Sequence, residues 1–577
     1  MRVNWKMDRV NDPERKVNIV GAGLAGLAAA LTLSRAGIPS RLISVQTSER
    51  AQSNLAEGGI NACLNVMGED DHPLEHYEDT MKGGCDLADP NMAAGLCLAA
   101  PGIIGELIEL GVPFQRENGQ LVQRSFGGQK KKRTSYVKSS TGKMITASMI
   151  DAVRRYECEG LVERFPRHEF RQLMILGGSC AGVLVHDNFR GEDLCLMGSV
   201  ILAMGGMNGM FSGQTTGSTA NTGNAAAVLF AQGVKMANLE MIQYHPTTVK
   251  IAGKRMLISE AARGEGGRLF YYGDDSDLPA GERSKVRFME DKYGERGNLM
   301  PRDVVSREMA ACGKEVYLDL TGLPDAVWEK KLSDLREEII HYLAIDPRSE
   351  PVPVAPGIHF FMGGILIDEG HRSSIPGLYA AGECACGYHG ANRLGGNSLL
   401  AAIYGGKTAA HTAAADRNSE MDDKPAGKEG NGLGDQRRVR YPDEIGDRSS
   451  AICDEQVSQI LLKSLPILRN EKDLSEGLME IRNLKKQMKG ESSECVNSLS
   501  YCRILLAEAI LMSAAARKES RGAHYVREYP ERAESFRKTT VVRCERDSVV
   551  TEFREIPVLR DSLRSRLYDV GNFRSQE

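Results

Sequence analysis

The sequence predicts an α/β fold built on a parallel sheet, with an inserted domain and a helical C-terminal part. Three observations support this prediction. A β-branched run at residues 17–20 leads through the glycines of GAGLAG into an Ala- and Leu-rich stretch that ends at Gly37. Two later apolar runs that end in glycine, residues 199–206 and 375–383, are typical of further strands of the same sheet. Between them, residues 236–352 differ in composition and are rich in Arg, Glu and His.

The first unit is predicted to be strand, turn, helix and strand over residues 17–45. Glycines with G-x-G-x-x-G spacing stand where the strand passes into the helix; in such a turn they allow the tight bend, the approach of a pyrophosphate and helix packing. The helix N-terminus then presents free N–H groups to phosphates. We therefore expect a dinucleotide site at Gly21, Ala22, Gly23, Leu24, Ala25 and Gly26. Ser44 stands where an acidic residue normally binds ribose, and its hydroxyl can still form a hydrogen bond.

Composition excludes several classes of protein. The chain has 577 residues and a net charge of −4, which does not favour binding to nucleic acid. No uninterrupted apolar run reaches the roughly 18 residues of a membrane span, and the first 20 residues do not resemble a secretory signal. The 13 cysteines are scattered without a CxxC pair, so we expect reduced thiols, no metal site and a cytoplasmic location.

The rest of the chain suggests further boundaries. Residues 416–450 are polar and Gly-rich, which predicts a linker, and residues 451–518 carry Leu, Ile and Met at helical spacing. The alternating TTVVRCERDSVVTEF segment predicts a small β unit near the end. We expect five parts, which are a nucleotide-binding domain (1–235 and 353–415), an inserted domain (236–352), the linker (416–450), a helical domain (451–518) and a C-terminal unit (519–577).

Four motifs contain polar residues suited to chemistry. The first is the EGG loop, residues 57–59. The second combines QYHP, which contains His245, with ISEAARGEGG, which contains Ser259, Glu260 and Arg263. The third is PRDVVSR with Arg302, and the fourth joins GIHFFMGG, with His359, to GANRLGGNSLL, with Arg393. Singly, each residue is more often structural, but an ordered set of this kind indicates an active site.

These motifs, in this order, resemble the flavoprotein subunit of succinate dehydrogenase and fumarate reductase. The similarity runs from residue 17 to 406 and resumes at residues 516–530. L-Aspartate oxidase shares most of the pattern. The resemblance implies a Rossmann-like FAD-binding domain with an inserted α+β capping domain, followed by a helical domain and a small C-terminal unit. It also implies FAD as cofactor and a C4-dicarboxylate as substrate.

The resemblance assigns roles to the polar residues. A dicarboxylate that leaves water needs both charges neutralised, and Arg provides bidentate hydrogen bonds in a fixed geometry. The implied substrate-binding residues are His245, Ser259, His359 and Arg393. Arg302 is the implied proton donor, supplied by Glu260 and Arg263. Because the ordinary pKa of arginine is above about 12, Arg302 can serve only as a relay whose proton returns at once from a neighbouring carboxylate.

The implied FAD contacts extend beyond the glycine turn. They are Ser53, Glu57, Gly58, Gly59, Gly205, Asn224, Glu383, Ser398 and Leu399, with residues 124–128 and 139–142 as further candidates. The helix that begins near Ser398 would direct its N–H groups and positive dipole at the flavin. The KKKR run at residues 130–133 is interpreted as a solvated loop.

One position departs from the family. Many relatives attach FAD covalently through a histidine five residues before the EGG acid, and this chain has Gln52 there. A carboxamide cannot form that bond, so we expect dissociable FAD with a lower potential, which favours reduction of fumarate. Asn224 stands where relatives often have Asp, which weakens one more expected contact.

The resemblance also implies partners. No cysteine spacing for an iron–sulfur cluster exists, so an iron–sulfur protein subunit must be separate. A membrane anchor subunit is implied too, which would place the chain peripherally on the cytoplasmic face. Two alternatives stay open: a free-standing L-aspartate oxidase, and a non-catalytic FAD-binding scaffold. The presence of Arg302, Glu260 and Arg393 together argues against the scaffold.

Overall fold

The computed structural model describes residues 16–274, 284–422, 448–491 and 495–569. At its centre lies a sheet of five parallel strands. In order across the sheet, these are β21 (Leu378–Ala380), β12 (Val200–Leu202), β1 (Val17–Val20), β2 (Ser40–Ser44) and β8 (Val162–Pro166). The predicted returning strands therefore join the first unit, and the α/β fold is confirmed.

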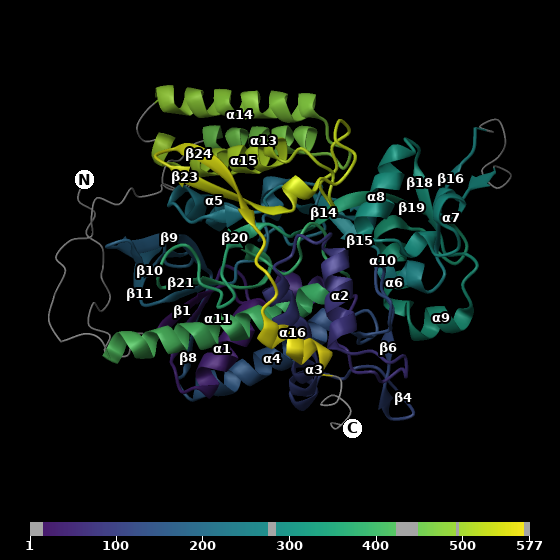
Figure 1. Cartoon of the computed structure of the whole chain (residues 1–577), viewed down its shortest axis with the longest axis horizontal. Coiled ribbons are helices and arrows are strands. Elements are labelled where there is room, and N and C mark those ends of the chain that lie inside the picture. Colours follow the sequence, from purple (N-terminus) through teal and green to yellow (C-terminus); the bar gives the residue numbers. More distant parts are fainter. Residues whose placement is uncertain (1–15, 275–283, 423–447, 492–494, 570–577) are drawn as a thin grey trace.

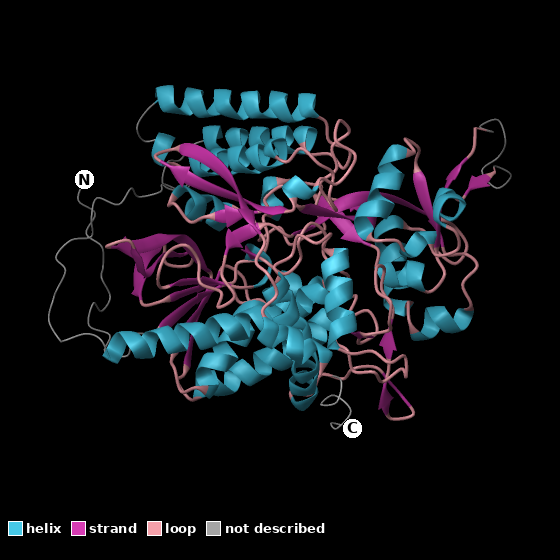
Figure 2. Cartoon of the chain, in the orientation of Figure 1, coloured by secondary structure: helices cyan, strands magenta, loops and turns pink. Residues whose placement is uncertain are grey.

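Helix α1 (Leu24–Arg35) forms because a run of Ala and Leu follows the glycine turn. All of its residues except Arg35 are buried, and it packs against α11 (Asn397–Asp422) and α4 (Thr141–Cys158). Figure 1 shows the long helix α11 beside α1 at the lower left. On the left of Figure 2, the strands lie between helices above and below. An antiparallel sheet of β9 (His168–Leu176), β10 (Ser179–Asp187) and β11 (Glu192–Met197) lies at the outer edge on the same side of the molecule.

The segment between β13 (Met236–Ala237) and β20 (Gly364–Leu366) contains its own sheet and its own hydrophobic core. Across that sheet the strands are β15 (Lys254–Leu257), β14 (Ile242–Ile251), β19 (Val352–Phe361), β18 (Val316–Asp319), β16 (Arg268–Tyr272) and β17 (Lys285–Val286). Its helices are α6 (Glu260–Gly264), α7 (Phe288–Tyr293), α8 (Arg302–Ala311), α9 (Asp325–Lys330) and α10 (Ser333–Leu343). Strands β14 and β19 lead from this region back to the centre.

The C-terminal helices α13 (Arg448–Ser464), α14 (Glu471–Glu491) and α15 (Leu499–Ala516) pack together along the top of Figure 1. They confirm the helical pattern of that region. The hairpin of β23 (Lys538–Glu545) and β24 (Ser548–Glu555) does not stand alone, because β23 pairs with β13. These strands form one sheet with β20 and β22 (Ala385–Cys386).

Two sequence-based expectations need adjustment. Helix α11 continues to Asp422, so the first seven residues of the predicted linker are helical, while residues 423–447 lie outside the described part. Helix α3 (Pro90–Glu109) and α15 have the length and hydropathy of a membrane span. Both lie in the folded core, where 56% and 83% of the respective apolar windows are buried, so they pack as interior helices.

The remaining elements connect these layers. They are α2 (Pro73–Gly83), α5 (Asn224–Ala231), α16 (Asp561–Tyr568), β3 (Ile60–Asn61), β4 (Arg116–Glu117), β5 (Gln120–Leu121), β6 (Gln123–Arg124) and β7 (Thr134–Ser135). Strands β3, β7 and β6 form a small sheet under the EGG loop. Asp89 caps α3 by accepting hydrogen bonds from the N–H groups of Asn91 and Met92.

Candidate active site

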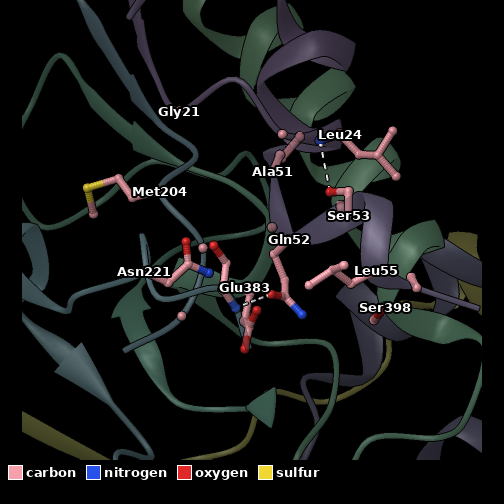
Figure 3. A pocket seen from close by; sticks show the side chains of 18 of the residues that line it. Gly21, Leu24, Ala51, Gln52, Ser53, Leu55, Met204, Asn221, Glu383 and Ser398 are labelled. Atoms are coloured by element: carbon pink, nitrogen blue, oxygen red, sulfur yellow. Dashed lines mark hydrogen bonds between the residues drawn. The ribbon is translucent and has the colours of Figure 1, made fainter. Parts of the chain in front are cut away.

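A single long cavity begins at the carboxyl edge of the parallel sheet and extends to the inserted region. The residues that directly follow β1, β2, β12 and β21 all line it. This edge is where open α/β sheets bind ligands. Figure 3 shows Ser53 beside Leu24, which begins α1. Gln52 and Leu55 lie close by, in the same short turn as Ser53.

The glycine turn at the sheet has room only for backbone. Gly21 adopts a φ of +114°, and a Cβ there would lie 2.0 Å from the Ala203 carbonyl oxygen. Gly23 is the N-cap of α1 and offers no side chain to cap it. Gly23, Leu24 and Ala25 line the cavity, so this end of the helix is available to an anion there, and the Leu24 N–H donates to Ser53 Oγ at 3.2 Å. Gly26 does not line the cavity; a Cβ there would lie 1.9 Å from the Gly21 carbonyl oxygen, so its role is packing.

The middle of the cavity is formed by the turn of residues 52–59. The Gln52 carboxamide oxygen accepts a hydrogen bond from the Ser218 N–H. Desolvation raises the pKa of Glu57 well above its ordinary value, which favours the neutral form of this side chain. Arg124 lies outside the cavity and supports the turn from below, because its guanidinium donates to the Gly58 carbonyl. Among residues 124–128 it is Phe126 that lines the cavity, and none of residues 139–142 does.

Helix α11 points its N-terminus at the cavity. Gly396, Ser398 and Leu399 line it there. The turn is fixed from behind by Asn61, whose amide donates to the Gly395 carbonyl at 2.7 Å and to Asn397 Oδ1 at 2.8 Å. The positive end of the helix dipole is therefore held toward any group placed in the middle of the cavity.

The far end of the cavity, here called the substrate end, contains His245, Ser259, Glu260, Arg302, His359 and Arg393. These residues come from β14, the N-cap of α6, α6, α8, β19 and the loop before α11. All except His359 are almost completely buried. The structure thus brings together every residue predicted to line this end.

Glu260 and Arg302 form the centre of this end. Arg302 Nε lies 2.9 Å from Glu260 Oε2, and the Gly127 N–H donates to Glu260 Oε1 at 2.8 Å. Burial alone would raise the pKa of Glu260, but the Arg302 and Arg263 guanidiniums and these hydrogen bonds bring it below its usual value. Glu260 is therefore ionised at pH 7 although it has almost no exposure to water.

The two histidines lie 5.2 Å apart between ring centroids, and both are neutral. Burial first, and then the charge of Arg302, lowers the pKa of each well below its ordinary value. The Nδ1 of His245 lies 3.1 Å from the Thr247 carbonyl oxygen, which can only accept, so the ring proton is assigned to Nδ1. The buried Nε2 has no hydrogen-bond partner. For His359, the Thr216 hydroxyl at 2.8 Å can donate to Nδ1 and leave the proton on Nε2.

Arg393 is a buried cation without a carboxylate hydrogen-bonded to it in the described structure. Its guanidinium carbon lies 4.4 Å from the centroid of the Phe360 ring, and its Nε has no partner. Burial, followed by repulsion from Arg302, lowers its pKa well below the ordinary value. A buried cation in this state is stabilised by an anion that enters the cavity.

Arg263 does not line the cavity. It lies behind Glu260, fully buried, and its Nη1 donates to the Asn298 carbonyl at 2.5 Å. Counting the charged groups at and directly behind the substrate end gives three guanidiniums and one carboxylate. Glu383, whose pKa is raised to about 7, also lines the cavity and acts electrostatically on Arg393. Positive charge therefore exceeds negative charge there.

Sequence reasoning missed Gln243. Its Oε1 accepts from Arg302 Nη1 at 3.2 Å, and its amide donates to the Arg393 carbonyl at 2.8 Å, so it links the two arginines. It stands two residues before His245 in the QYHP motif, and this period-two spacing along a strand could have identified it. Met204, Ser218, Ala220 and Asn221 also line the cavity and were missed, because they lie outside the motifs that drew attention.

The cavity fits a dinucleotide with an aromatic ring system. Glycines form the wall where phosphates would approach, and a helix N-terminus points at each of two stretches. Glu383, which is half-buried and whose pKa desolvation raises to about 7, lies in the turn after β21. Ser44, Gly205 and Asn224 also line it, as predicted. Among the described residues, no group of three or more His, Cys, Asp and Glu is placed to hold a metal ion.

Comparisons with known proteins agree with this arrangement. A sequence profile described as "FAD binding domain" matches residues 16–399, and one described as "Fumarate reductase flavoprotein C-term" matches residues 454–568. The succinate dehydrogenase flavoprotein subunit of Bacillus subtilis is 34% identical, over 92% of this chain and 94% of that protein. One chain of the fumarate reductase (CoM/CoB) of Methanothermobacter marburgensis is 33% identical, over 92% of this chain and 97% of that one.

Two further similarities bear on the function. An L-aspartate oxidase of Streptomyces coelicolor is 31% identical, over 92% of each chain. A solved structure of a quinol–fumarate reductase with menaquinol molecules superposes with a TM-score of 0.81 at 25% identity, covering 94% of this chain and 98% of that one.

Proposed function

Because the chain belongs to the succinate dehydrogenase and fumarate reductase flavoprotein family of FAD-dependent oxidoreductases, we propose that it interconverts fumarate and succinate, working mainly as a fumarate reductase. The observation that carries this proposal is the charge at the substrate end. Arg263, Arg302 and Arg393 outnumber the ionised Glu260 and the partly ionised Glu383, and a dianion of four carbons supplies the negative charge that these buried cations lack.

Each anchoring side chain is suited to a carboxylate. Arg393 has an unpaired buried Nε, and a guanidinium matches a carboxylate with two parallel hydrogen bonds. His359 offers Nε2–H, and Ser259 offers a hydroxyl at the start of α6. Anchoring at both ends fixes the position of the central carbon–carbon bond, which converts binding energy into alignment for reaction.

Arg302 is the proposed proton donor to the substrate carbon. It lies in the cavity and is hydrogen-bonded to Glu260, which in turn faces Arg263 on the side away from the cavity. Glu260 is a carboxylate at rest, so it can return a proton to the Arg302 guanidinium only after it has accepted one itself. We assign the supply of that proton to Arg263, which then regains a proton from solvent. Glu260 and Arg263 thus supply a proton along a buried path that admits no bulk water to the substrate.

FAD, when bound, supplies the hydride that the other alkene carbon receives. We propose that the glycine turn at residues 21–25 and the α1 N-terminus hold its pyrophosphate, and that Ser44 and Glu383 contact ribose or phosphate groups. Ser53, Gly205 and Asn224 complete that wall. The EGG turn and the α11 N-terminus at Ser398 and Leu399 would lie along the flavin ring.

The FAD is proposed to be bound without a covalent link. Gln52 occupies the position where a histidyl attachment is expected, and its carboxamide is already hydrogen-bonded to the Ser218 N–H. No Cys or Tyr lines the described cavity, and two of its three histidines belong to the substrate end. Lack of the electron-withdrawing histidyl substituent lowers the flavin potential, which favours electron donation to fumarate.

Electrons are proposed to arrive from a separate iron–sulfur protein. The described chain has 13 free cysteines, and none of them lines the cavity. Similarity to chains of reductases and dehydrogenases supports a partner of this kind, with a membrane anchor protein beyond it. Such an assembly would hold this chain at the cytoplasmic face.

The charge pattern weighs against the L-aspartate oxidase alternative. An amino acid substrate carries an ammonium group, which needs a carboxylate or another free acceptor. Of the described residues, Glu260 is the carboxylate at the substrate end, and both of its oxygens already accept hydrogen bonds. Anaerobic mixing of the purified protein with aspartate or succinate tests this point, because flavin bleaching by aspartate but not by succinate would reject the proposal.

A further inference from the structure

The four consecutive cations Lys130, Lys131, Lys132 and Arg133 do not form a free solvated loop. Each of them contacts the segment of residues 69–79, which precedes and begins α2. Lys130 Nζ lies 3.0 Å from Glu78 Oε2, Lys131 Nζ donates to the Glu69 carbonyl at 2.6 Å, and Lys132 Nζ lies 3.3 Å from Glu69 Oε1. We call this set of contacts, including those of Arg133, the acid–base clamp.

Arg133 is the strongest member of the clamp. Its Nη2 lies 3.0 Å from both Asp71 Oδ1 and Asp79 Oδ2, and all three side chains have at most 2% exposure. Asp79 Oδ2 also accepts the Lys130 backbone N–H at 3.0 Å. Exposed lysine pairs contribute little, whereas removing one partner of a buried pair leaves an uncompensated charge. The loop is therefore anchored mainly through Arg133.

The residues just before the clamp contact each part of the candidate site. Gly127 donates its N–H to Glu260 Oε1, and a Cβ at this position would lie 2.5 Å from that oxygen and 3.0 Å from the Leu299 carbonyl. Gln129 donates to Asn61 Oδ1 at 2.9 Å and to the Gly395 carbonyl at 3.0 Å. One short stretch, residues 126–129, thus joins the proton path to the turn before α11.

We propose that the acid–base clamp is a positioning device that holds the Gly127 N–H on the Glu260 carboxylate. The inference rests on the proposed function, because Glu260 then belongs to the proton path. Arg133 and its carboxylate partners do not line the cavity, so the clamp acts on the reaction through Gly127.

The charged groups around Glu260 set the direction of the effect. Arg302 on α8, Arg263 on α6 and Arg393 before α11 favour the carboxylate, while His245 and His359 are neutral. Burial acts in the opposite direction and raises the pKa of Glu260. Losing the Gly127 hydrogen bond therefore raises the pKa of Glu260, and the acidic limb of the pH–rate profile moves to higher pH.

The test is the pH profile of kcat for fumarate reduction by reduced viologen, measured on the purified FAD-loaded protein. Arg133→Met should move the acidic limb upward by about one pH unit, and Gly127→Ala should move it in the same direction. Arg133→Lys, which keeps the charge, should restore most of the wild-type profile. Lys485→Met removes a mostly buried ion pair to Glu508, 2.6 Å long and in the helical region, and should leave the profile unchanged.

Flavin content and thermal melting establish that each variant is folded. If Arg133→Met does not fold, Asp79→Asn takes its place, because it removes one of the two negative charges on Arg133 at nearly constant size. A wild-type acidic limb in the folded variant overturns the clamp proposal. Absence of fumarate turnover in the unmodified protein instead overturns the proposed function, so the two failures are distinguishable.

Discussion

Arg302 Nε lies 2.9 Å from Glu260 Oε2, and neither side chain has more than 10% exposure. The guanidinium favours the ionised form of the buried Glu260, and both side chains line the cavity. The same guanidinium can therefore neutralise substrate charge and exchange a proton with the carboxylate behind it.

Replacing Arg302 tests its role as proton donor. Arg302→Gln removes the charge and the proton but keeps a hydrogen-bonding side chain. We expect kcat for fumarate to fall by at least about 1,000-fold while the flavin content stays at the wild-type level. Steady-state assays with reduced viologen and the flavin absorbance measure both quantities, and turnover within about tenfold of wild type would reject the assignment.

Replacing Arg393 tests the anchoring of a carboxylate. Arg393→Met keeps the contact with Phe360 but removes the charged hydrogen bonds, so kcat/KM for fumarate should fall by about 100-fold. Arg336→Gln is the matched control, because Arg336 forms a bidentate pair with Asp346 on the surface of the inserted region. Equal effects of the two changes would show that Arg393 does not contact the substrate.

Binding of a dicarboxylate should take up a proton at His245. The pKa of His245 lies well below its ordinary value, so the free protein has a neutral ring with its proton on Nδ1, directed at Thr247. A carboxylate next to Nε2 raises that pKa and favours the imidazolium. Affinity for succinate should therefore weaken with rising pH, by about tenfold per pH unit between the His245 pKa of the free protein and that of the complex.

Calorimetry in two buffers of different ionisation enthalpy measures this uptake. We expect about one proton per succinate for the unmodified protein and none for His245→Gln. Identical binding enthalpies in the two buffers would mean that His245 binds the ligand as a neutral ring.

The mode of FAD attachment decides whether the flavin is released when the protein is denatured. Acid precipitation of the purified protein should leave all of its flavin in the supernatant, since Gln52 cannot form a histidyl bond. A denaturing gel should show no fluorescent band at the mass of the chain. Flavin that stays with the precipitate would place a covalent link elsewhere on the cavity wall.

The C-terminal segment is tied to the inserted region by buried ion pairs. Arg517 has no exposure and lies 2.7 Å from Glu240 Oε1 and 2.9 Å from Glu519 Oε1. Arg517→Met leaves Glu240 buried without its cation, whereas Glu519 keeps its pair with Arg521, and the change should lower the free energy of unfolding by about 3–5 kcal/mol. Lys472→Gln, which removes an exposed contact of 3.9 Å, should change it by less than about 0.5 kcal/mol. Calorimetric melting compares the two, and equal melting temperatures would contradict the argument.

Local patterns allowed much of the fold to be predicted. The strand, glycine turn and helix of residues 17–35 are encoded in consecutive residues, so both the elements and their place at the cavity could be anticipated. The pairing of β23 with β13 could not, because it joins residues about 300 positions apart. The end of helix α11 was also not predicted, because the helix continues into a polar segment that was expected to be a linker.

The substrate end shows a similar division. Arg302 and Arg393 were identified through a family resemblance, because nothing in the local sequence indicates that residues 91 positions apart share a cavity. Gly26 and Arg263 belong to motifs that line the cavity, but they themselves lie behind its wall. A motif does not show which of its residues line a cavity and which pack behind it. The KKKR run is only partly the solvated loop that was expected. Lys130 and Lys132 are exposed, but Arg133 is fully buried against Asp71 and Asp79, which lie more than 50 residues earlier in the chain.

Turnover of a substrate panel by the purified FAD-loaded protein tests the central claim most directly. Fumarate and a monocarboxylate alkene are compared with reduced viologen as donor, and flavin reduction by aspartate is measured in parallel. The excess of positive charge at the substrate end predicts turnover of fumarate alone. Rapid turnover of the monocarboxylate, or flavin reduction by aspartate with no activity on fumarate, would contradict the claim that Arg302 and Arg393 hold a C4 dianion.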